Sequence, residues 1–231
     1  MRNHIAVIPA RGGSKRIPRK NIKHFRGLPI IGHVLKKVLN SGLFDRVIVS
    51  TDDEAIASVS RQFGAETPFL RSVQLSQDET PTVPVIKDSI QQLYESNPPQ
   101  FVTAIYPCTP FIDMNDIKDA LEILINSETN YVFPACKFSP PPQRGLTIDS
   151  DQNTTSINPA FAWTRSQDLE PVYFDAGQFY CGYAKSWLNE EELHNHSKAV
   201  LIPPWRAVDI DTPEDWRLAE LLYEASTQMK L

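Results

Sequence analysis

Short apolar runs alternate with segments of helical spacing along most of the chain, and this alternation constrains the fold more than any other feature. Residues 4–8 (HIAVI) and 46–50 (RVIVS) have the length and composition of buried strands. Apolar residues keep helical spacing in segments 30–39, 53–63, 85–94 and 117–124. Strands separated by helices predict a doubly wound α/β domain with a mostly parallel sheet, and ligands of such sheets usually bind beyond the carboxyl ends of the strands.

The second half of the chain continues this rhythm after an interruption. We expect strands at residues 101–106, 178–183, 199–202 and 206–210. Thr212-Pro213 followed by two acids predicts the start of a last helix. Residues 137–175, rich in Pro, Asn, Gln and Ser, show neither period. We therefore expect one domain over residues 1–231 with an insertion at 137–175, and an insert of this length is usually a lid or a subunit contact.

The distribution of charge indicates where an anionic ligand binds. The 231 residues carry a net charge of −5, but the first 44 contain ten Lys and Arg and no acid. The remaining 187 residues carry 13 cations against 28 acids. A short cationic segment on an acidic body favours a small polyanion such as a phosphate compound, and it argues against a nucleic-acid partner, which needs a wider basic face.

Composition also limits the cellular setting. The chain is 41% apolar, but its apolar runs are short, and we expect neither a signal peptide nor a membrane span. The three cysteines, Cys108, Cys136 and Cys181, form no CxxC pair and no even disulfide framework. We therefore expect the protein to work in reducing cytoplasm.

The segment 8–21 (IPARGGSKRIPRKN) lies where the first strand gives way to the first helix, and it contains five cations and no acid. Glycine lets backbone N–H groups approach a ligand closely, while Arg and Lys neutralise phosphate oxygens. The loop lacks the GxxxxGK[ST] and GxGxxG patterns, which disfavours kinases, ATPases and dehydrogenases. It is typical of a triphosphate site, although composition alone also allows a solvated basic loop.

Asp209 and Asp211 are separated by one residue on an expected strand, so their side chains should point to the same face. Two nearby carboxylates suit Mg²⁺, which accepts few protein ligands and keeps waters and phosphate oxygens. The spacing alone also allows Asp211 to cap the last helix and Asp209 to pair with an arginine. Arginines of the insertion, Arg144 and Arg165, could likewise grip a carboxylate or simply face solvent.

Several motifs together resemble one known family, the cytidylyltransferases that make CMP-activated sugar acids, including the CMP-sialic acid synthetases. The resemblance spans nearly the whole chain. It is strongest in IPARGGSKRIPRKN (8–21), STDD (50–53), LSQDETPT (75–82), YPCTPF (106–111), PPQR (141–144), TRSQDLEPVYFDAGQFY (164–180) and DIDTPEDW (209–216). TRSQDL and DAGQFY look particularly like the branch that acts on pseudaminic acid. Residues 158–161 (NPAF), Phe174 and Cys181 depart from that branch, which affects the choice of sugar more than the reaction.

The resemblance implies a fold of the nucleotide-diphospho-sugar transferase type with a dimerisation flap at 137–175, a homodimer, Mg²⁺ as cofactor, and CTP and a nonulosonic acid as substrates. It implies metal binding by Asp209 and Asp211, which with Arg11 and Lys20 form the expected catalytic set. The implied nucleotide site contains Arg11, Gly12, Gly13, Ser14, Lys15, Lys20, Asn21 and Ser76. The implied sugar site contains Gln143, Arg144, Arg165, Gln167, Asp175 and Gln178.

The expected function is transfer of CMP from CTP to a nonulosonic acid, with pseudaminic acid as the first candidate. Synthesis of a CMP-sialic or CMP-legionaminic acid is the alternative within the family, since it would use the same phosphate site and metal pair. A non-catalytic nucleotide-binding module is the alternative from another class. The presence of both Asp209 and Asp211 disfavours that module.

Overall fold

A computed structural model of the chain describes residues 3–229, and its centre is a mixed seven-stranded sheet. The strand order is β11-β6-β10-β5-β1-β4, and β9 pairs with the carboxyl half of β6. Strands β4, β1 and β5 are parallel, β10 is antiparallel to both of its neighbours, and β11 is parallel to β6. The strands are β1 (His4–Pro9), β4 (Arg46–Ser50), β5 (Phe101–Ile105), β6 (Tyr131–Lys137), β9 (Tyr173–Asp175), β10 (Phe179–Tyr183) and β11 (Ser197–Leu201).

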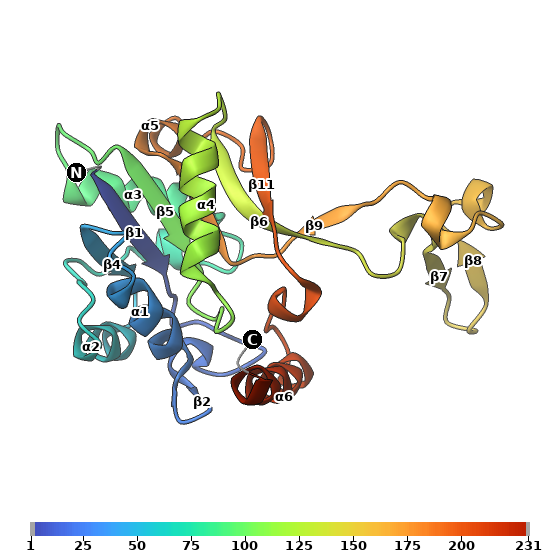
Figure 1. Cartoon of the computed structure of the whole chain (residues 1–231). Helices are drawn as coiled ribbons and strands as arrows, with labels where there is room; N and C mark the ends of the chain where they lie inside the picture. Colours follow the sequence, from blue (N-terminus) through green and yellow to red (C-terminus); the bar gives the residue numbers. More distant parts are fainter. Residues whose placement is uncertain (1–2, 230–231) are drawn as a thin grey trace.

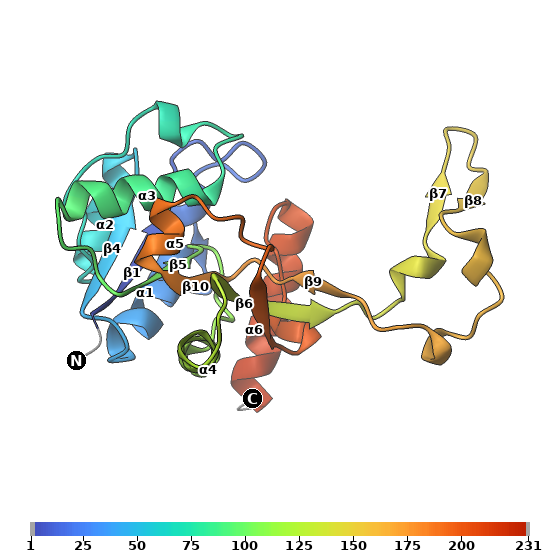
Figure 2. The same ribbon diagram turned by 90° about the horizontal axis from the view of Figure 1, so that it is seen from above.

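Helices cover both faces of this sheet because alternate side chains of each strand point to opposite faces. In β1, Ala6 and Ile8 belong to the core beneath α1 (Ile30–Asn40), α2 (Glu54–Gln62) and α4 (Met114–Ile125). Ile5 and Val7 belong to the core beneath α3 (Thr82–Leu93) and α5 (Ala184–Leu188). Figure 2 shows α3 and α5 on one side of the sheet and α4 on the other. The two cores explain why β1 is buried almost throughout.

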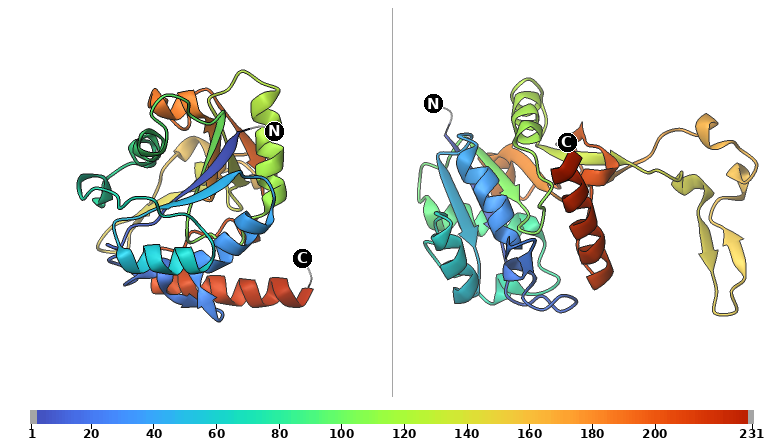
Figure 3. Two further views of the ribbon diagram at one scale, coloured as in Figure 1. Left: turned by 90° about the vertical axis from the view of Figure 1, so that its left-hand side faces the viewer. Right: turned by 60° about the horizontal axis from the view of Figure 1, so that its bottom comes forward.

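The C-terminal helix α6 (Pro213–Met229) packs against the N-terminal segments, far from it in sequence (Figure 3). Trp216 and Ala219 join Phe25 and Ile30 in a buried cluster beside the short hairpin of β2 (His24–Phe25) and β3 (Leu28–Pro29). At the helix start, the Thr212 hydroxyl accepts a hydrogen bond from the backbone N–H of Asp215 at 3.2 Å. The Asp215 carboxylate in turn accepts from the Thr212 N–H at 2.7 Å, a reciprocal capping box.

Between β6 and β9 the chain leaves the body as an extended arm (Figure 1). The arm contains the hairpin of β7 (Leu146–Ile148) and β8 (Thr154–Ser156) and the single 3₁₀ turns η3 (Pro142–Arg144), η4 (Pro159–Phe161) and η5 (Ser166–Asp168). It exposes large apolar side chains, among them Ile148, Ile157 and Trp163, the last 97% exposed. Exposed apolar groups concentrated in one segment are a mark of an interaction surface.

The predicted α/β class with its mostly parallel sheet is confirmed, and so are the strands and helices expected in the first 110 residues. One expected strand is wrong: residues 206–210 pair with no strand of the described chain. Pro203 and Pro204 lack backbone donors and open a 3₁₀ turn, η6 (Pro204–Arg206), which leads the chain away from the sheet. Among residues 3–229, no helix is long and apolar enough to cross a membrane.

Candidate active site

A cavity of about 320 Å³ opens beyond the carboxyl ends of β1 and β5, where the fold class predicts a ligand site. The loop after β1 contributes most of its cations, the loop after β5 contributes Tyr106 to Thr109, and the segment before α6 contributes Asp209 and Asp211. The loop leading into α3 closes another side with Leu75, Gln77 and Asp78. Segments far apart in sequence therefore line one cavity with both positively and negatively charged side chains.

The predicted phosphate loop does present cations to this cavity. Of the residues predicted to bind nucleotide, Arg11, Ser14, Lys15, Lys20 and Asn21 line it. Arg11 and Lys15 both form ion pairs with Asp78, which lowers the pKa of that carboxyl. Since Asp78 is largely solvated, these pairs are weak and a triphosphate can replace them.

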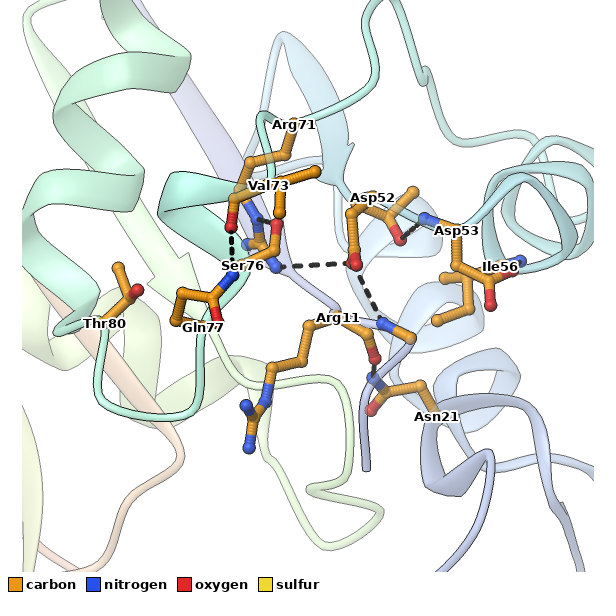
Figure 4. Close-up of polar contacts among 12 residues, drawn as sticks. Arg11, Asn21, Asp52, Asp53, Ile56, Arg71, Val73, Ser76, Gln77 and Thr80 are labelled. Carbon is orange, nitrogen blue, oxygen red and sulfur yellow. Dashed lines mark hydrogen bonds and ion pairs between the residues drawn. The ribbon is translucent and has the colours of Figure 1, made fainter. Parts of the chain in front are cut away.

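Lys20 is held more firmly than its neighbours. Its ammonium donates to the Ile210 carbonyl at 2.7 Å and to an oxygen of Asp211 at 3.2 Å, and the side chain is only 21% exposed. Arg16 pairs with the other oxygen of Asp211 at 2.7 Å. Asn21 donates from its amide to the Arg11 carbonyl at 2.8 Å, which fixes the turn of the loop (Figure 4). The basic loop and the Asp segment are thus joined directly.

Sequence reasoning missed Arg71, a buried cation of the cavity wall. Its guanidinium Nε donates to the Ser76 hydroxyl at 3.1 Å, and Nη2 lies 3.9 Å from Asp52 (Figure 4). Burial lowers the pKa of Arg71, with Asp52 opposing that effect. Arg71 falls between the STDD and LSQDET motifs with no pattern around it. Only the fold, which places its loop beside the end of β4, shows that it lines the cavity.

Three of the predicted nucleotide-site residues do not line the cavity: Gly12, Gly13 and Ser76. The Gly12 N–H points at Asp52 and donates to its carboxylate at 2.9 Å, so it is already satisfied. A Cβ at Gly12 would lie 2.8 Å from an oxygen of Asp53 and 2.9 Å from its Cβ, whereas a Cβ at Gly13 meets nothing within 4 Å. The first glycine is needed for packing.

Gly12→Ala should therefore destabilise the fold while Gly13→Ala should not. The added methyl displaces Asp53, whose carboxylate caps α2 by accepting from the N–H groups of Ala55 at 2.7 Å and Ile56 at 3.1 Å. Loss of such a cap costs about 1 kcal/mol. Urea unfolding measures this, with Gly13→Ala as the matched control. Equal unfolding free energies for the two variants would contradict the packing role of Gly12.

Asp209 and Asp211 both line the cavity, but their environments differ. Asp211 pairs with Arg16 and Lys20, whereas Asp209 has no hydrogen bond or ion pair within residues 3–229. Burial raises the pKa of Asp209, and the charge of Asp211 adds to this. An exposed carboxylate without a partner, beside a second one, fits a divalent cation. The described residues contain no cluster of three or more His, Cys, Asp or Glu suited to a metal, so most ligands would be phosphate oxygens and water.

Asp175 and Gln178 do not line the cavity, although Gly177, which lies between them in sequence, does. Asp175 accepts hydrogen bonds from the Tyr180 hydroxyl at 2.5 Å and the Gly177 N–H at 2.8 Å, and its carboxylate lies 2.7 Å from the His194 ring. Gln178 is buried and donates to the Arg206 carbonyl at 2.5 Å. Its amide oxygen is also buried, with no partner among the described residues.

The other four predicted sugar-site residues lie on the arm, and none of them lines the cavity. Within the arm, Arg165 pairs with Asp168 at 2.7 Å, Arg144 donates to Ser166 at 3.2 Å, and Gln143 donates to the Glu170 carbonyl at 2.8 Å. Gln167 is exposed. Within one chain, the fold therefore does not bring Gln143, Arg144, Arg165 and Gln167 to the cations.

Comparison with known proteins decides the family. A sequence-family profile described as "Cytidylyltransferase" matches residues 5–160. The chain belongs to the cytidylyltransferase family. Pseudaminic acid cytidylyltransferases from two strains of Campylobacter jejuni are 37% and 38% identical to it over 225 residues, covering 96% of this chain and 97% of theirs. A CMP-N,N'-diacetyllegionaminic acid synthase from Legionella pneumophila is 33% identical, with 97% of each chain covered.

Two solved structures show that the cytidylyltransferase fold is shared more widely. CMP:2-keto-3-deoxy-manno-octonic acid synthetase complexed with CTP has a TM-score of 0.72 at 16% identity, covering 97% of this chain and 99% of that one. The 4-diphosphocytidyl-2C-methyl-D-erythritol synthase of Anaerococcus prevotii has a TM-score of 0.62 at 16% identity, covering 96% and 98%. The resemblance seen in the sequence is thus confirmed for the family and the fold, and the protein is a nucleotidyltransferase.

Proposed function

We propose that this cytidylyltransferase transfers CMP from CTP to a nonulosonic acid, with pseudaminic acid as the acceptor. The observation that supports it most is that one cavity is lined both by Arg11, Lys15 and Lys20 and by the unpartnered Asp209. Such a site can hold a triphosphate and a divalent cation together. The acceptor is inferred from the similarity to the two Campylobacter jejuni enzymes over nearly the whole chain.

In the proposed reaction, a hydroxyl oxygen at the anomeric carbon of the acid bonds to the α-phosphorus of CTP. The bond from that phosphorus to the β-phosphate oxygen breaks, pyrophosphate leaves with the electron pair, and the hydroxyl proton passes to solvent. Lys15, Lys20 and Arg11 neutralise the charge that grows on pyrophosphate. Mg²⁺ bound by Asp209 and Asp211 would lower the pKa of the hydroxyl and neutralise the α-phosphate. The chain itself contributes mainly position and charge.

Competition among acceptors tests the sugar assignment. Pseudaminic, legionaminic and N-acetylneuraminic acids are supplied separately with CTP, and kcat/KM is measured from pyrophosphate release. We expect pseudaminic acid to give the highest value. A higher value for legionaminic acid would move the protein to the activity named for its Legionella pneumophila relative, and turnover of N-acetylneuraminate above both would make it a CMP-sialic acid synthetase.

We further propose that two chains pair through their arms and that the arm of one supplies the sugar-carboxylate contact of the other. Arg144 and Arg165 lie on the arm and do not line the cavity of their own chain. The exposed apolar side chains of Ile148, Ile157 and Trp163 would be buried by a partner surface. A two-fold homodimer satisfies both needs. The partners we propose are thus CTP, the sugar acid and a second copy, and the setting we propose is the cytoplasm.

Arg165→Ala should raise KM for the sugar acid at least about tenfold, because a charge-assisted contact is worth about 1.5–3 kcal/mol, while KM for CTP should change little. Steady-state kinetics with each substrate varied in turn measures both constants. Arg61→Ala is the matched control, since Arg61 forms a surface pair with Glu54 away from the cavity. Equal rises in both constants would remove Arg165 from the sugar site.

Deleting residues 149–160 should shift the protein from dimer toward monomer in sedimentation velocity. The deletion removes β8 and the first two residues of η4, and so dismantles the apolar hairpin while leaving the body untouched. Circular dichroism and thermal unfolding serve as controls for the remaining fold. A dimer that persists after the deletion would show that the arm hairpin is not the interface.

A further inference from the structure

The Asp209–Asp211 pair lies on a segment that no regular element holds in place. Between the end of β11 at Leu201 and the start of α6 at Pro213, the described chain forms only the single turn η6. Pairing with β6 ends with the Ile202 N–H, which donates to the Ala135 carbonyl at 3.0 Å. The position of the two carboxylates must therefore be fixed by side chains that bind this segment.

Arg206, three residues before Asp209, is one of the side chains that hold this segment. Its Nη1 lies 2.6 Å and its Nη2 3.1 Å from the two oxygens of Asp116 in the first turn of α4, and Nη1 also lies 3.6 Å from Asp113. The side chains of Arg206 and Asp116 are only 13% and 11% exposed. A buried bidentate pair fixes orientation as well as distance, because the planar guanidinium matches both carboxylate oxygens.

The start of α4, which carries Asp116, is itself held in place. The carboxylate of Asp113 caps α4 by accepting from the Asn115 N–H at 2.9 Å. Lys37 of α1 donates to the carbonyls of Pro110 at 2.8 Å and Ile112 at 2.9 Å, which holds the loop that leads into α4. Burial lowers the pKa of Lys37. Arg206 therefore connects the irregular segment to a rigid part of the core.

Gln178 also holds Arg206, through its backbone carbonyl. Its buried amide donates to the Arg206 carbonyl at 2.5 Å, and this is the only bond of the Gln178 side chain within residues 3–229. Gln178 directly precedes β10 in the central sheet, and its own carbonyl accepts from the Tyr106 N–H at 2.9 Å. The backbone of residue 206 is thus held from the sheet while its side chain is held from α4.

We propose that Arg206 is a positioning residue for Asp209 and Asp211, and that Gln178 acts with it. The inference depends on the proposed function only in taking this pair as the site of the divalent cation. Arg206 does not line the cavity and touches neither carboxylate, so its effect is on where the pair lies. Losing a residue that orients metal ligands typically lowers metal affinity about 10- to 100-fold.

The substitution Arg206→Lys tests this positioning role, because lysine keeps the positive charge but lacks the planar guanidinium that binds both oxygens of a carboxylate. Arg46→Lys is the matched control, because Arg46, the first residue of β4, also forms a bidentate pair, with Glu66, away from the cavity. Mn²⁺ serves as the probe, and its Kd is measured by electron paramagnetic resonance in the presence of α,β-methylene-CTP, which is not turned over. The Kd of the same nucleotide in EDTA and the thermal unfolding midpoint are measured alongside.

We expect Arg206→Lys to weaken Mn²⁺ binding about tenfold or more. The nucleotide Kd in EDTA should stay within about twofold of the wild-type value, and Arg46→Lys should leave both constants unchanged. Gln178→Met, which keeps the side-chain length and removes the donor, should weaken Mn²⁺ in the same direction and decides the matter if Arg206→Lys does not fold. A folded Arg206→Lys that binds Mn²⁺ within about twofold of wild type would overturn the proposal.

Asp209→Asn in the same assay distinguishes failure of the proposed metal site from failure of the positioning role of Arg206. If Asp209→Asn loses Mn²⁺ binding and Arg206→Lys does not, the metal site stands and the positioning role fails. If Asp209→Asn and Asp211→Asn bind Mn²⁺ as the wild type does, the metal is held elsewhere and the proposed mechanism fails with it.

Discussion

Asp209→Asn should reduce kcat/KM about a hundredfold or more while leaving the fold intact. Asparagine has nearly the same volume but lacks the charge, and Asp209 makes no hydrogen bond or ion pair within the described chain that the change would break. Asp211→Asn should cause a similar loss, with an additional effect on Arg16 and Lys20, which both pair with it. The expected loss reflects a cation that is bound weakly or not at all.

Pyrophosphate release measured across a Mg²⁺ titration checks this expectation, with circular dichroism to confirm folding. Asp119→Asn on the exposed side of α4 is the matched control, since it removes the same charge far from the cavity. Asp209→Asn and Asp211→Asn variants that both keep wild-type activity at every Mg²⁺ concentration would place the metal role on other residues.

Lys20→Ala should lower kcat/KM for CTP about tenfold to a hundredfold, corresponding to about 1.5–3 kcal/mol for one charge-assisted contact. Lys20 is the least exposed cation of the phosphate loop, and its link to the Ile210 carbonyl directs its ammonium into the cavity. The loss should appear in the CTP constants more than in those of the sugar acid, because the triphosphate carries the charge that Lys20 neutralises.

Arg19→Ala provides the control for Lys20→Ala, since Arg19 belongs to the same basic loop but lies outside the cavity and is mostly solvated. Steady-state kinetics with CTP varied at saturating acceptor compares the two variants. Equal losses would mean that the loop acts through its total charge, and unchanged kinetics in Lys20→Ala would show that the basic loop does not bind the triphosphate.

Much of the fold could be predicted because the relevant signals are local. Strands such as β4 are short apolar runs, and α2 follows an aspartate that caps it. Strand β6 was not predicted: its sequence, YVFPACK, contains a proline, which usually argues against a strand in the middle of a sheet. Pro134 accepts hydrogen bonds there, from the Ala176 N–H for example, and the missing donor is tolerated.

The site could be predicted only in part, for a similar reason. The cations of residues 11–20 are adjacent in sequence, so their shared role is visible from composition. Arg71 and Arg206 are positioned by long-range contacts: Asp52 lies 19 positions before Arg71, and Asp116 lies 90 positions before Arg206. No local sequence pattern indicates either arginine. The arm residues show the opposite case, because recognisable motifs lie far from the cavity of their own chain.

The most direct test of the central claim is to follow the phosphorus atoms of CTP. The protein is incubated with Mg²⁺, pseudaminic acid and CTP, and the products are identified by ³¹P NMR and mass spectrometry. We predict one phosphodiester product with the mass of CMP joined to the acid, together with an equal amount of pyrophosphate. CTP that binds but stays intact, or that yields free CMP and pyrophosphate without a sugar product, would contradict transfer of CMP to a nonulosonic acid.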